Sequence, residues 1–266
     1  MTATLRKWRA VYSICLQETI AYRASMAIWV LTDLTTAVVM PLVWAAAANN
    51  GTIQGMATGD FVLYYLAMLQ VGSFVTSHIM WDLAGEIREG IFSIYLVRPI
   101  SVYQYTLLRN LSWRTIRPLV ALPFFLTLFI LYRPLMGEVR VYLGWEFWVA
   151  VVLGHFVSFC FVMAMAMIAL FIQEAFAVFE LYYVPQLFLS GYLFPVALLP
   201  DWAKSIAHVF PFYYTTGAPV EILIGKVSGF DCYRVMGIQV LWIAISYVLG
   251  WVLWVRGLRH YTGVGM

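Results

Sequence analysis

Residues 148–172 read WVAVVLGHFVSFCFVMAMAMIALFI, without a single Asp, Glu, Lys or Arg. A helix needs about 20 mostly apolar residues to cross the hydrocarbon core of a bilayer. The rest of the chain has the same character, because 63% of its 266 residues are hydrophobic and only 11% are charged. A soluble domain carries about 25% charged residues. The sequence therefore predicts an all-α integral membrane protein.

Working outward from this stretch, we expect six transmembrane helices. The predicted spans are residues 26–48, 61–81, 119–132, 148–172, a proline-interrupted run from 175 toward 199, and 236–255. The third is short and must borrow from the residues before it. Most Lys and Arg residues fall on the side that holds both termini, and such an excess marks the cytoplasmic side. Both termini are therefore expected in the cytoplasm.

The chain divides into an N-terminal segment, residues 1–25, and a single transmembrane domain, residues 26–266. The N-terminal segment is predicted to be an amphipathic helix, because its apolar and aromatic side chains recur at helical spacing: Trp8, Val11, Tyr12, Cys15, Leu16 and Thr19. Basic amphipathic helices of this kind lie in the membrane interface. The alternative is a plain positively charged anchor for the first span. Residues 1–25 have no apolar core or cleavage site typical of a signal peptide.

A second unusual segment, residues 188–226, is apolar but contains Pro195, Pro200, Pro211 and Pro219. Proline breaks helices, and unpaired backbone is very costly in lipid. We expect short helical pieces that enter the outer side of the membrane and return, shielded by protein. A hydrophobic extracellular loop is the alternative.

Motifs for catalysis are missing. The sequence has no phosphate-binding loop, no zinc-protease motif and no nucleophile elbow. The three cysteines form no pair with metal-ligand spacing, and the net charge of +3 gives no sign of a nucleic-acid partner. We therefore expect no catalytic, cofactor or metal site in this chain, and no enzyme activity of its own.

Two other functions stay open at this stage. Ionisable residues inside spans are functional candidates by default, so Asp33 and Glu180 would serve an ion-gradient-driven secondary transporter. Structural roles for these groups are favoured, because they are few and most lie near predicted span ends. A membrane-embedded enzyme would have to use His155 and His208 with nearby acids.

The loop after the second span, residues 82–117, contains the mixed stretch GEIREGIFSIYLVRPIS at 85–101. Leu83, Ile87, Ile91 and Ile94 follow helical spacing and form an apolar stripe that is expected to hold the loop to the membrane domain. Pro99 should end the helix. The loop is predicted to be either a docking surface for a soluble partner or a solvated extension of the second span.

Two longer runs then point to a family. The run AGEIREGIFSIYLVRPISVYQY (84–105) and the run LSGYLFPVALLPDWAKSIAHVFPFYYTTGAPVEIL (189–223) resemble the permease subunit of a type 2 ABC exporter, in the branch with an EIREG…RP coupling loop. The resemblance covers nearly the whole chain. Phe92-Ser93 departs from the small-polar and acidic residues expected at that place.

The resemblance implies an assembly and a set of roles. Two permease subunits, identical or paralogous, would work in the plasma (inner) membrane with two separate ATPase subunits that bind ATP and Mg. The pathway would export an amphipathic or lipid-like molecule, in contact with membrane lipid. The ATPase would be contacted by the coupling helix, at Glu86, Ile87, Arg88, Glu89 and Gly90.

Candidate residues for the transport pathway come from the first and fifth predicted spans and from the outer segment, residues 188–226. Candidates for lining or gating it are Asp33, Tyr182, Phe188, Tyr192, Phe194 and Pro195. Ordinary packing is the competing role for each aromatic side chain in this set.

Overall fold

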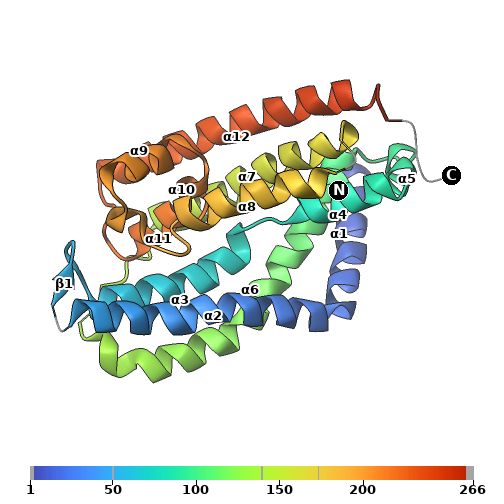
Figure 1. Ribbon diagram of the computed structural model, residues 1–266. Coiled ribbons are helices and arrows are strands. Elements are labelled where there is room, and N and C mark those ends of the chain that lie inside the picture. The colour runs from blue at the N-terminus through green and yellow to red at the C-terminus, as the bar shows by residue number, and fades with distance from the viewer. Residues whose placement is uncertain (1–2, 50, 139, 173, 262–266) are drawn as a thin grey trace.

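The computed structural model describes residues 3–49, 51–138, 140–172 and 174–261, and over these ranges it is a bundle of helices (Figure 1). The α-helices are α1 (Ala3–Ala21), α2 (Arg23–Ala48), α3 (Thr58–Val75), α4 (Ile79–Arg88), α5 (Phe92–Leu96), α6 (Val102–Met136), α7 (Trp145–Ala166), α8 (Ala175–Leu189), α9 (Asp201–Val209), α10 (Phe212–Thr215), α11 (Gly217–Leu223) and α12 (Phe230–Gly257). Two 3₁₀ turns, η1 (Met167–Leu170) and η2 (Val196–Leu198), and a hairpin of β1 (Thr52–Ile53) and β2 (Met56–Ala57) complete the described chain.

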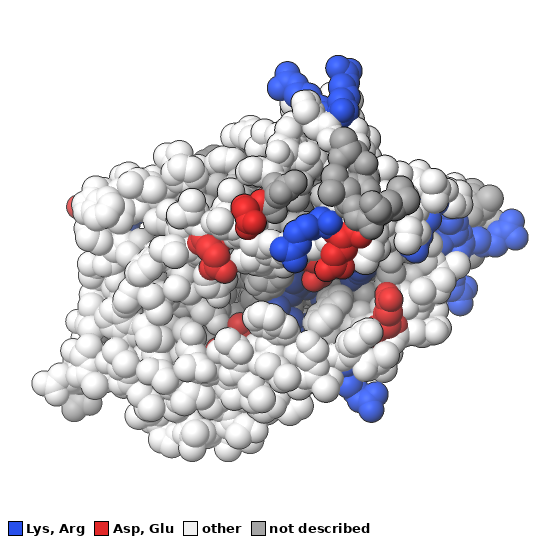
Figure 2. Space-filling model, turned by 45° about the vertical axis from the view of Figure 1, so that its right-hand side comes forward, with Lys and Arg blue, Asp and Glu red and all other residues white. Residues whose placement is uncertain are grey.

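Five helical stretches in the described part of the chain are long and apolar enough to cross a bilayer. They are α2, α3 continued by α4, α6, α7 continued by η1, and α12. The prediction of an all-α, multi-pass membrane protein is confirmed. On the face shown in Figure 2, charged side chains gather toward one end, and a broad uncharged surface covers most of the rest.

The bundle has an inner and an outer layer. In their most apolar windows, α3–α4 and α7–η1 are 72% and 67% buried, whereas α2, α6 and α12 are only 22%, 22% and 17% buried. The outer helices α2 and α6 pack along α3, and α12 packs along α7. Because the exposed faces of the outer helices are apolar, they are suited to lipid or to another membrane subunit.

The third predicted span borrows from the residues before it, as expected, but the helix is longer than predicted at both ends. Residues 119–132 are only the middle of α6, which runs without a break from Val102 to Met136 over 35 residues. The basic residues Arg114 and Arg117, expected in a cytoplasmic loop, are buried inside the bundle on this helix. The helix continues through them because their charges find polar partners there, as described below.

The fifth predicted span is shorter than expected. Helix α8 covers 15 residues, continues through Pro185 and ends at Leu189. That length is below the roughly 20 residues that cross a bilayer without help. The six-span count therefore stays a prediction.

Helix α1 lies along α6, and both chain ends are at the same end of the bundle (Figure 1). The side chains predicted to form its apolar face are those that it turns inward, with Cys15 and Thr19 fully buried. The Thr19 and Ser112 hydroxyls are 2.9 Å apart, and the Tyr12 and Thr115 hydroxyls 2.7 Å. This end also carries α5, and we call it the α5 end.

The opposite end holds the hairpin and the short helices that follow α8 (Figure 1). Every residue from 211 to 224, a range that contains α10 and α11, is buried. These helices approach α7 closely, since a Cβ built on Gly154 would lie 2.3 Å from the carbonyl oxygen of Thr215. The amide of Gln239 on α12 donates to the carbonyls of Ala150 and Tyr214, which joins α12, α7 and α10. The segment is thus folded into the protein and is not a loose loop.

Candidate functional site

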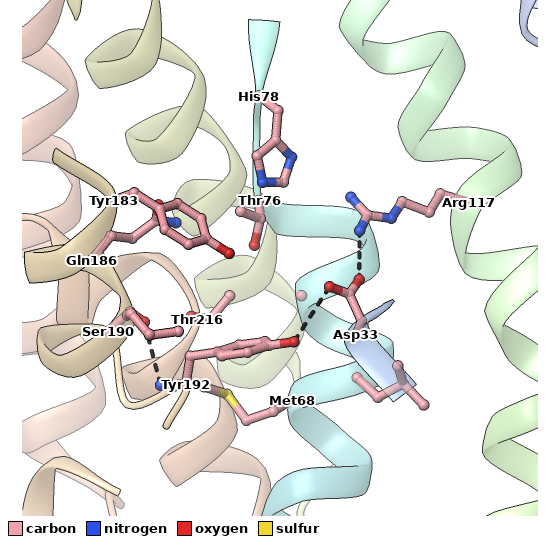
Figure 3. Close-up of a pocket in the computed structure, with 13 residues that line it drawn as sticks. Asp33, Met68, Thr76, His78, Arg117, Tyr183, Gln186, Ser190, Tyr192 and Thr216 are labelled. Atoms are coloured by element: carbon pink, nitrogen blue, oxygen red, sulfur yellow. Dashed lines mark hydrogen bonds and ion pairs between the residues drawn. The ribbon is translucent and has the colours of Figure 1, made fainter. Parts of the chain in front are cut away.

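A small polar cavity of about 50 Å³ lies inside the bundle (Figure 3). It is bounded by α2, α3, α6, α8 and the segments that follow α3 and α8. Its lining residues are Asp33, Met68, Leu69, Gly72, Thr76, His78, Arg117, Tyr183, Gln186, Leu187, Ser190, Tyr192 and Thr216. Polar and charged side chains are rare inside membrane proteins and mark functional regions when they gather. We call this space the polar cavity.

The strongest interaction at the polar cavity joins α2 to α6. Arg117 donates to the carboxylate of Asp33 at 2.5 Å, and the Tyr192 hydroxyl donates to the other carboxylate oxygen at 3.3 Å (Figure 3). The side chain of Arg117 is 7% exposed and that of Asp33 is 28% exposed. A charge so far from water is tolerated only when it is paired. Asp33 therefore links three separate parts of the chain.

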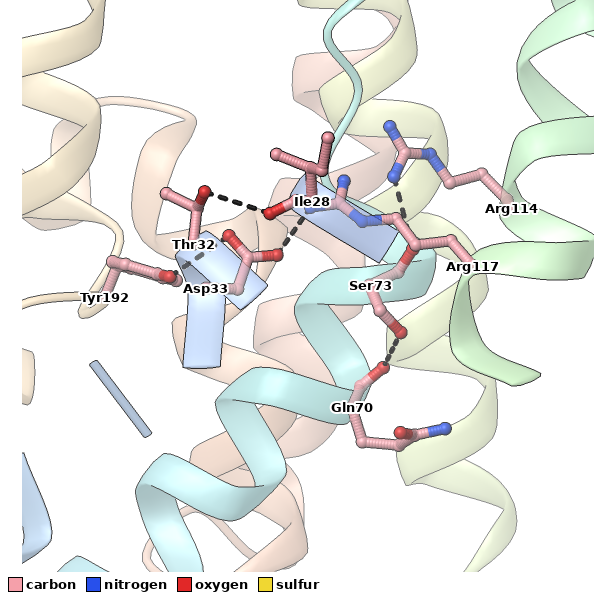
Figure 4. A network of polar contacts seen from close by, with 8 residues as sticks. All are labelled: Ile28, Thr32, Asp33, Gln70, Ser73, Arg114, Arg117 and Tyr192. Atoms are coloured by element: carbon pink, nitrogen blue, oxygen red, sulfur yellow. Dashed lines mark hydrogen bonds and ion pairs between the residues drawn. The ribbon is translucent and has the colours of Figure 1, made fainter. Parts of the chain in front are cut away.

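A second arginine lies one turn away on the same helix. Arg114 is buried and donates to the carbonyl of Ser73 at 3.2 Å (Figure 4). It makes no ion pair with the described residues. Ser73 is in the last turn of α3, where backbone carbonyls lack helical partners and the helix dipole favours a cation. The Arg114 side chain therefore stabilises the C-terminal end of α3 by hydrogen bonding to one of its free carbonyls.

The end of α3 is a break within a single membrane span. Residues 76–78 are not helical, and α4 begins at Ile79. The freed polar groups find partners: the Ser77 amide donates to the Ser158 hydroxyl at 2.8 Å, and the Ser77 hydroxyl donates to Asn110 at 3.2 Å. Non-helical backbone at membrane depth occurs where protein or a cavity shields it. The predicted span at 61–81 gave no sign of this break, since it contains no proline.

The predicted pathway residues separate into three groups. Asp33 and Tyr192 meet at the polar cavity. Phe188 and Phe194 stack with ring centroids 6.0 Å apart and form, with Trp44, a separate aromatic cluster; Pro195 precedes η2. Tyr182 packs instead against Phe161 and Phe212. Sequence reasoning did not place Arg114 or Arg117 here.

The described structure does not bring together the residues considered for a secondary transporter, nor those considered for a membrane-embedded enzyme. Glu180 is exposed on α8 and does not line the polar cavity. His155 is buried in α7 and packs against Phe74, whereas His208 lies on α9 against Tyr213. Among the described residues, no three His, Cys, Asp or Glu side chains are grouped as metal ligands would be.

The predicted coupling segment forms two helices instead of one. Helix α4 ends at Arg88, the chain turns at Gly90 with φ of +77°, and α5 follows. Because of this turn, the expected stripe is wrong in part: Ile87 is buried, but Ile91 and Ile94 are 40% and 52% exposed. The side chain that anchors α5 is Phe92, which is fully buried against Trp254 and Tyr261.

Glu86 points inward and organises this turn. One of its carboxylate oxygens accepts from Arg109 at 2.6 Å and from the Tyr95 hydroxyl at 2.9 Å. Burial raises the pKa of Tyr95, and the nearby charge of Glu86 raises it further, so the phenol stays protonated and keeps donating. Arg88 and Glu89, by contrast, are exposed. Glu86 thus fixes α5, while Arg88 and Glu89 lie at the surface, the Arg88 guanidinium 5.1 Å from the centroid of the Phe176 ring.

With this geometry in view, we compared the chain with known proteins. Residues 33–265 match the family described as "ABC-2 family transporter protein". No curated protein and no solved structure shows a significant match.

Proposed function

The chain belongs to the ABC-2 transporter family, and on that premise we propose that it is the permease subunit of an ATP-driven exporter. Two permease subunits, identical or paralogous, would form the pathway for an amphipathic or lipid-like substrate. Two separate ATPase subunits would bind ATP and Mg and supply the energy. We also propose that the chain is a member of the exporter branch whose permeases have an EIREG…RP coupling loop.

The observation that carries the proposal is the surface of α5. Apolar side chains face outward on and beside this helix: Ile91, Ile94, Leu96 and Val97, the last 83% exposed. Exposed Arg88 and Glu89 lie beside them on the chain. A short helix with an apolar face and charged flanks suits a hydrophobic groove on a soluble partner. We call these six residues the docking surface.

A docking surface transmits force only if it is rigid, and α5 is held from behind. Phe92 is fully buried, and Tyr95 is tied to Glu86, which is tied in turn to Arg109 on α6. A displacement of α5 would therefore be transmitted directly to α6 through these contacts. In this proposal Arg88 and Glu89 contact the ATPase, whereas Glu86, Ile87 and Gly90 shape and position the turn.

Helix α6 connects the docking surface to the polar cavity. Arg109 near its start holds Glu86, and Arg117 two turns later holds Asp33 on α2. We infer that displacement of α6 loosens the Asp33–Arg117 pair and separates α2 from α8 beside the cavity. The polar cavity would then be one part of the pathway or its gate.

The proposed topology follows from the charge distribution and the chain ends. The α5 end would face the cytoplasm of the plasma (inner) membrane, with both termini there. Helix α8 would be the fifth of six spans, completed by the buried helices α10 and α11, which enter from the outer side and return. The burial of all residues from 211 to 224 supports this arrangement.

The test uses the tagged full-length chain, purified from its native membrane and assayed for Mg-dependent ATP hydrolysis. The wild-type preparation should hydrolyse ATP through a co-purified ATPase. The double variant Ile94→Asp/Val97→Asp should lose that activity, because acids on the docking surface oppose burial in a groove.

Leu143→Asp is the matched control, since Leu143 is an exposed apolar residue between α6 and α7. It should keep the activity. Transport that depends on an ion gradient and needs no ATPase would refute the proposal in favour of a secondary transporter.

A further inference from the structure

A groove lies at the α5 end, apart from the polar cavity and beside the docking surface, with which it shares Leu96. It has a volume of about 540 Å³ and is bounded by α1, the turn after α5, the start of α6 and the last turns of α12. Its lining residues are Lys7, Tyr95, Leu96, Arg98, Pro99, Ile100, Ser101, Val102, Tyr103, Tyr247, Trp251 and Trp254. We call it the interfacial groove.

Two cations lie at the groove, and no carboxylate from the described part of the chain lines it. Lys7 donates to the carbonyl of Pro99 at 2.9 Å, which uses one of its three donors. The guanidinium of Arg98 lies over the rings of Tyr95 and Tyr105, at 4.9 and 5.1 Å from their centroids. Arg98 makes no ion pair with any residue in the described ranges. Both cations are therefore held in place and still have donors for an anion.

The other wall of the groove is aromatic and belongs to α12. Tyr247, Trp251 and Trp254 follow one another at four and three residues, so they share one face of the helix. Trp251 is 57% exposed. Tyr247 and Trp254 are about 10 Å apart along the helix axis at 1.5 Å per residue. This face can therefore cover the first part of an acyl chain.

The depth of the groove fits the membrane interface. Trp254 lies one turn before the end of α12 at Gly257, and α12 is a membrane span by length and composition. Trp and Tyr gather at the level of lipid headgroups. The cations are therefore placed at headgroup level, and the aromatic wall runs from there toward the hydrocarbon core.

We propose that the interfacial groove binds one anionic phospholipid, with its phosphate between Lys7 and Arg98 and an acyl chain along Tyr247, Trp251 and Trp254. Basic pockets between membrane helices are suited to anionic headgroups. The charge of the groove favours a lipid with net negative charge. A zwitterionic lipid would bring its own headgroup cation close to Lys7 and Arg98, and an apolar protein segment would leave both cations without a counterion. A bound lipid would join α1, α5 and α12 at the end where the proposed ATPase docks.

The experiment presents the full chain with equal amounts of phosphatidylglycerol and phosphatidylcholine of the same acyl chains in detergent micelles. Native mass spectrometry then counts the lipids that stay bound. The wild-type chain should retain phosphatidylglycerol preferentially. Lys7→Gln/Arg98→Gln should reduce that preference at least fivefold, since each basic side chain near a membrane surface contributes about a fivefold change in occupancy.

The matched control is Arg133→Gln/Arg140→Gln, which makes the same charge change at two exposed residues, one in the last turn of α6 and one between α6 and α7. The control should keep the wild-type preference. Equal retention by the Lys7/Arg98 variant and the wild type would overturn the proposal, as would equal loss in the variant and the control. Thermal unfolding and size-exclusion profiles show whether each variant is folded.

Two further measurements test the lipid assignment without substituting Lys7 or Arg98. Raising salt from about 50 mM to about 500 mM should weaken retention of phosphatidylglycerol in the wild type but not that of phosphatidylcholine. Trp251→Ala should lower retention of phosphatidylglycerol, because the acyl chain loses its wall. Displacement of the lipid by inorganic phosphate, with no effect of Trp251→Ala, would identify a site for free anions and overturn the lipid assignment.

Discussion

At the scale of single residues, the central feature is a partly buried ion pair that joins several helices. Asp33 accepts from Arg117 on α6 and from Tyr192 after α8, so its carboxylate joins segments far apart in the sequence. Removing one partner of such a pair costs more than the pair contributes, because the remaining charge stays buried. The pair therefore favours the observed arrangement of α2, α6 and α8.

We predict that Asp33→Asn and Arg117→Gln are each destabilising, and that the double variant is less so than the sum of the two. A broken buried pair costs about 3–5 kcal/mol, and the partial exposure of Asp33 lowers the expected cost to about 2 kcal/mol. Thermal unfolding in lipid nanodiscs measures all three variants in a double-mutant cycle.

Thr32→Ala is the control, since the exposed Thr32 hydroxyl only donates to the Ile28 carbonyl on its own helix. It should change stability little. Strictly additive effects of the Asp33 and Arg117 substitutions would show that the two side chains do not interact in the folded protein.

At the scale of elements, the close approach of α10 to α7 holds the segment after α8 inside the bundle. Gly154 allows this contact, because a side chain there would meet the Thr215 carbonyl. Gly237 on α12 offers the opposite case: a Cβ built there meets nothing within 4 Å. Both glycines are inside long helices, where alanine is intrinsically favoured by up to about 1 kcal/mol.

Gly154→Ala should therefore be destabilising by about 1–3 kcal/mol, since the backbone of α10 must shift to make room. Gly237→Ala should leave the protein as stable or make it slightly more so. Thermal unfolding of both variants in the same detergent makes the comparison. Equal melting temperatures for the two would mean that α10 does not pack on α7 as described.

The long apolar helices could be predicted from the sequence, because a run such as residues 148–172 has only one stable form in a bilayer. The break at residues 76–78 could not, since it depends on Ser158 and Asn110, which come from other helices. The same holds for Arg114 and Arg117. The local sequence predicts that these basic residues lie in a loop. In the structure, the carboxylate of Asp33 on α2 and the carbonyl of Ser73 on α3 stabilise them in buried positions.

The sequence predicts a short helix after the second span but not its detailed form, and its docking role stays a prediction. Its position after the second span follows from local charge and from Pro99. The outward turn of Ile91 and Ile94 depends on the reversal at Gly90 and on the burial of Phe92 against α12. Helical spacing counted straight through Gly90 therefore assigns the wrong face.

At the scale of the whole molecule, the bundle has two structurally distinct ends. The start of α1, the end of α12 and α5 lie at one end, and the hairpin and helices α9 to α11 lie at the other (Figure 1). The three native cysteines are buried, so a single introduced cysteine reports on its own position with little background. This makes the proposed topology directly measurable.

We predict that a membrane-impermeant maleimide labels Gln54→Cys and Ser205→Cys in intact cells. Both residues are exposed at the end opposite α5. Glu89→Cys, which is exposed at the α5 end, should react only after the cells are permeabilised. Labelling of Glu89→Cys in intact cells would reverse the orientation, and labelling of Ser205→Cys from the cytoplasm would refute α8 as a span.

The central claim is that force received at α5 reaches the polar cavity through α6. The most direct measurement is the labelling rate of Gln186→Cys, which lines the cavity, in proteoliposomes that contain the complex with its ATPase. Mg-ATP should raise the labelling rate several-fold, and the rise should disappear when Ile94→Asp/Val97→Asp is added. A labelling rate that Mg-ATP leaves unchanged, or that rises equally in the α5 variant, would contradict the claim.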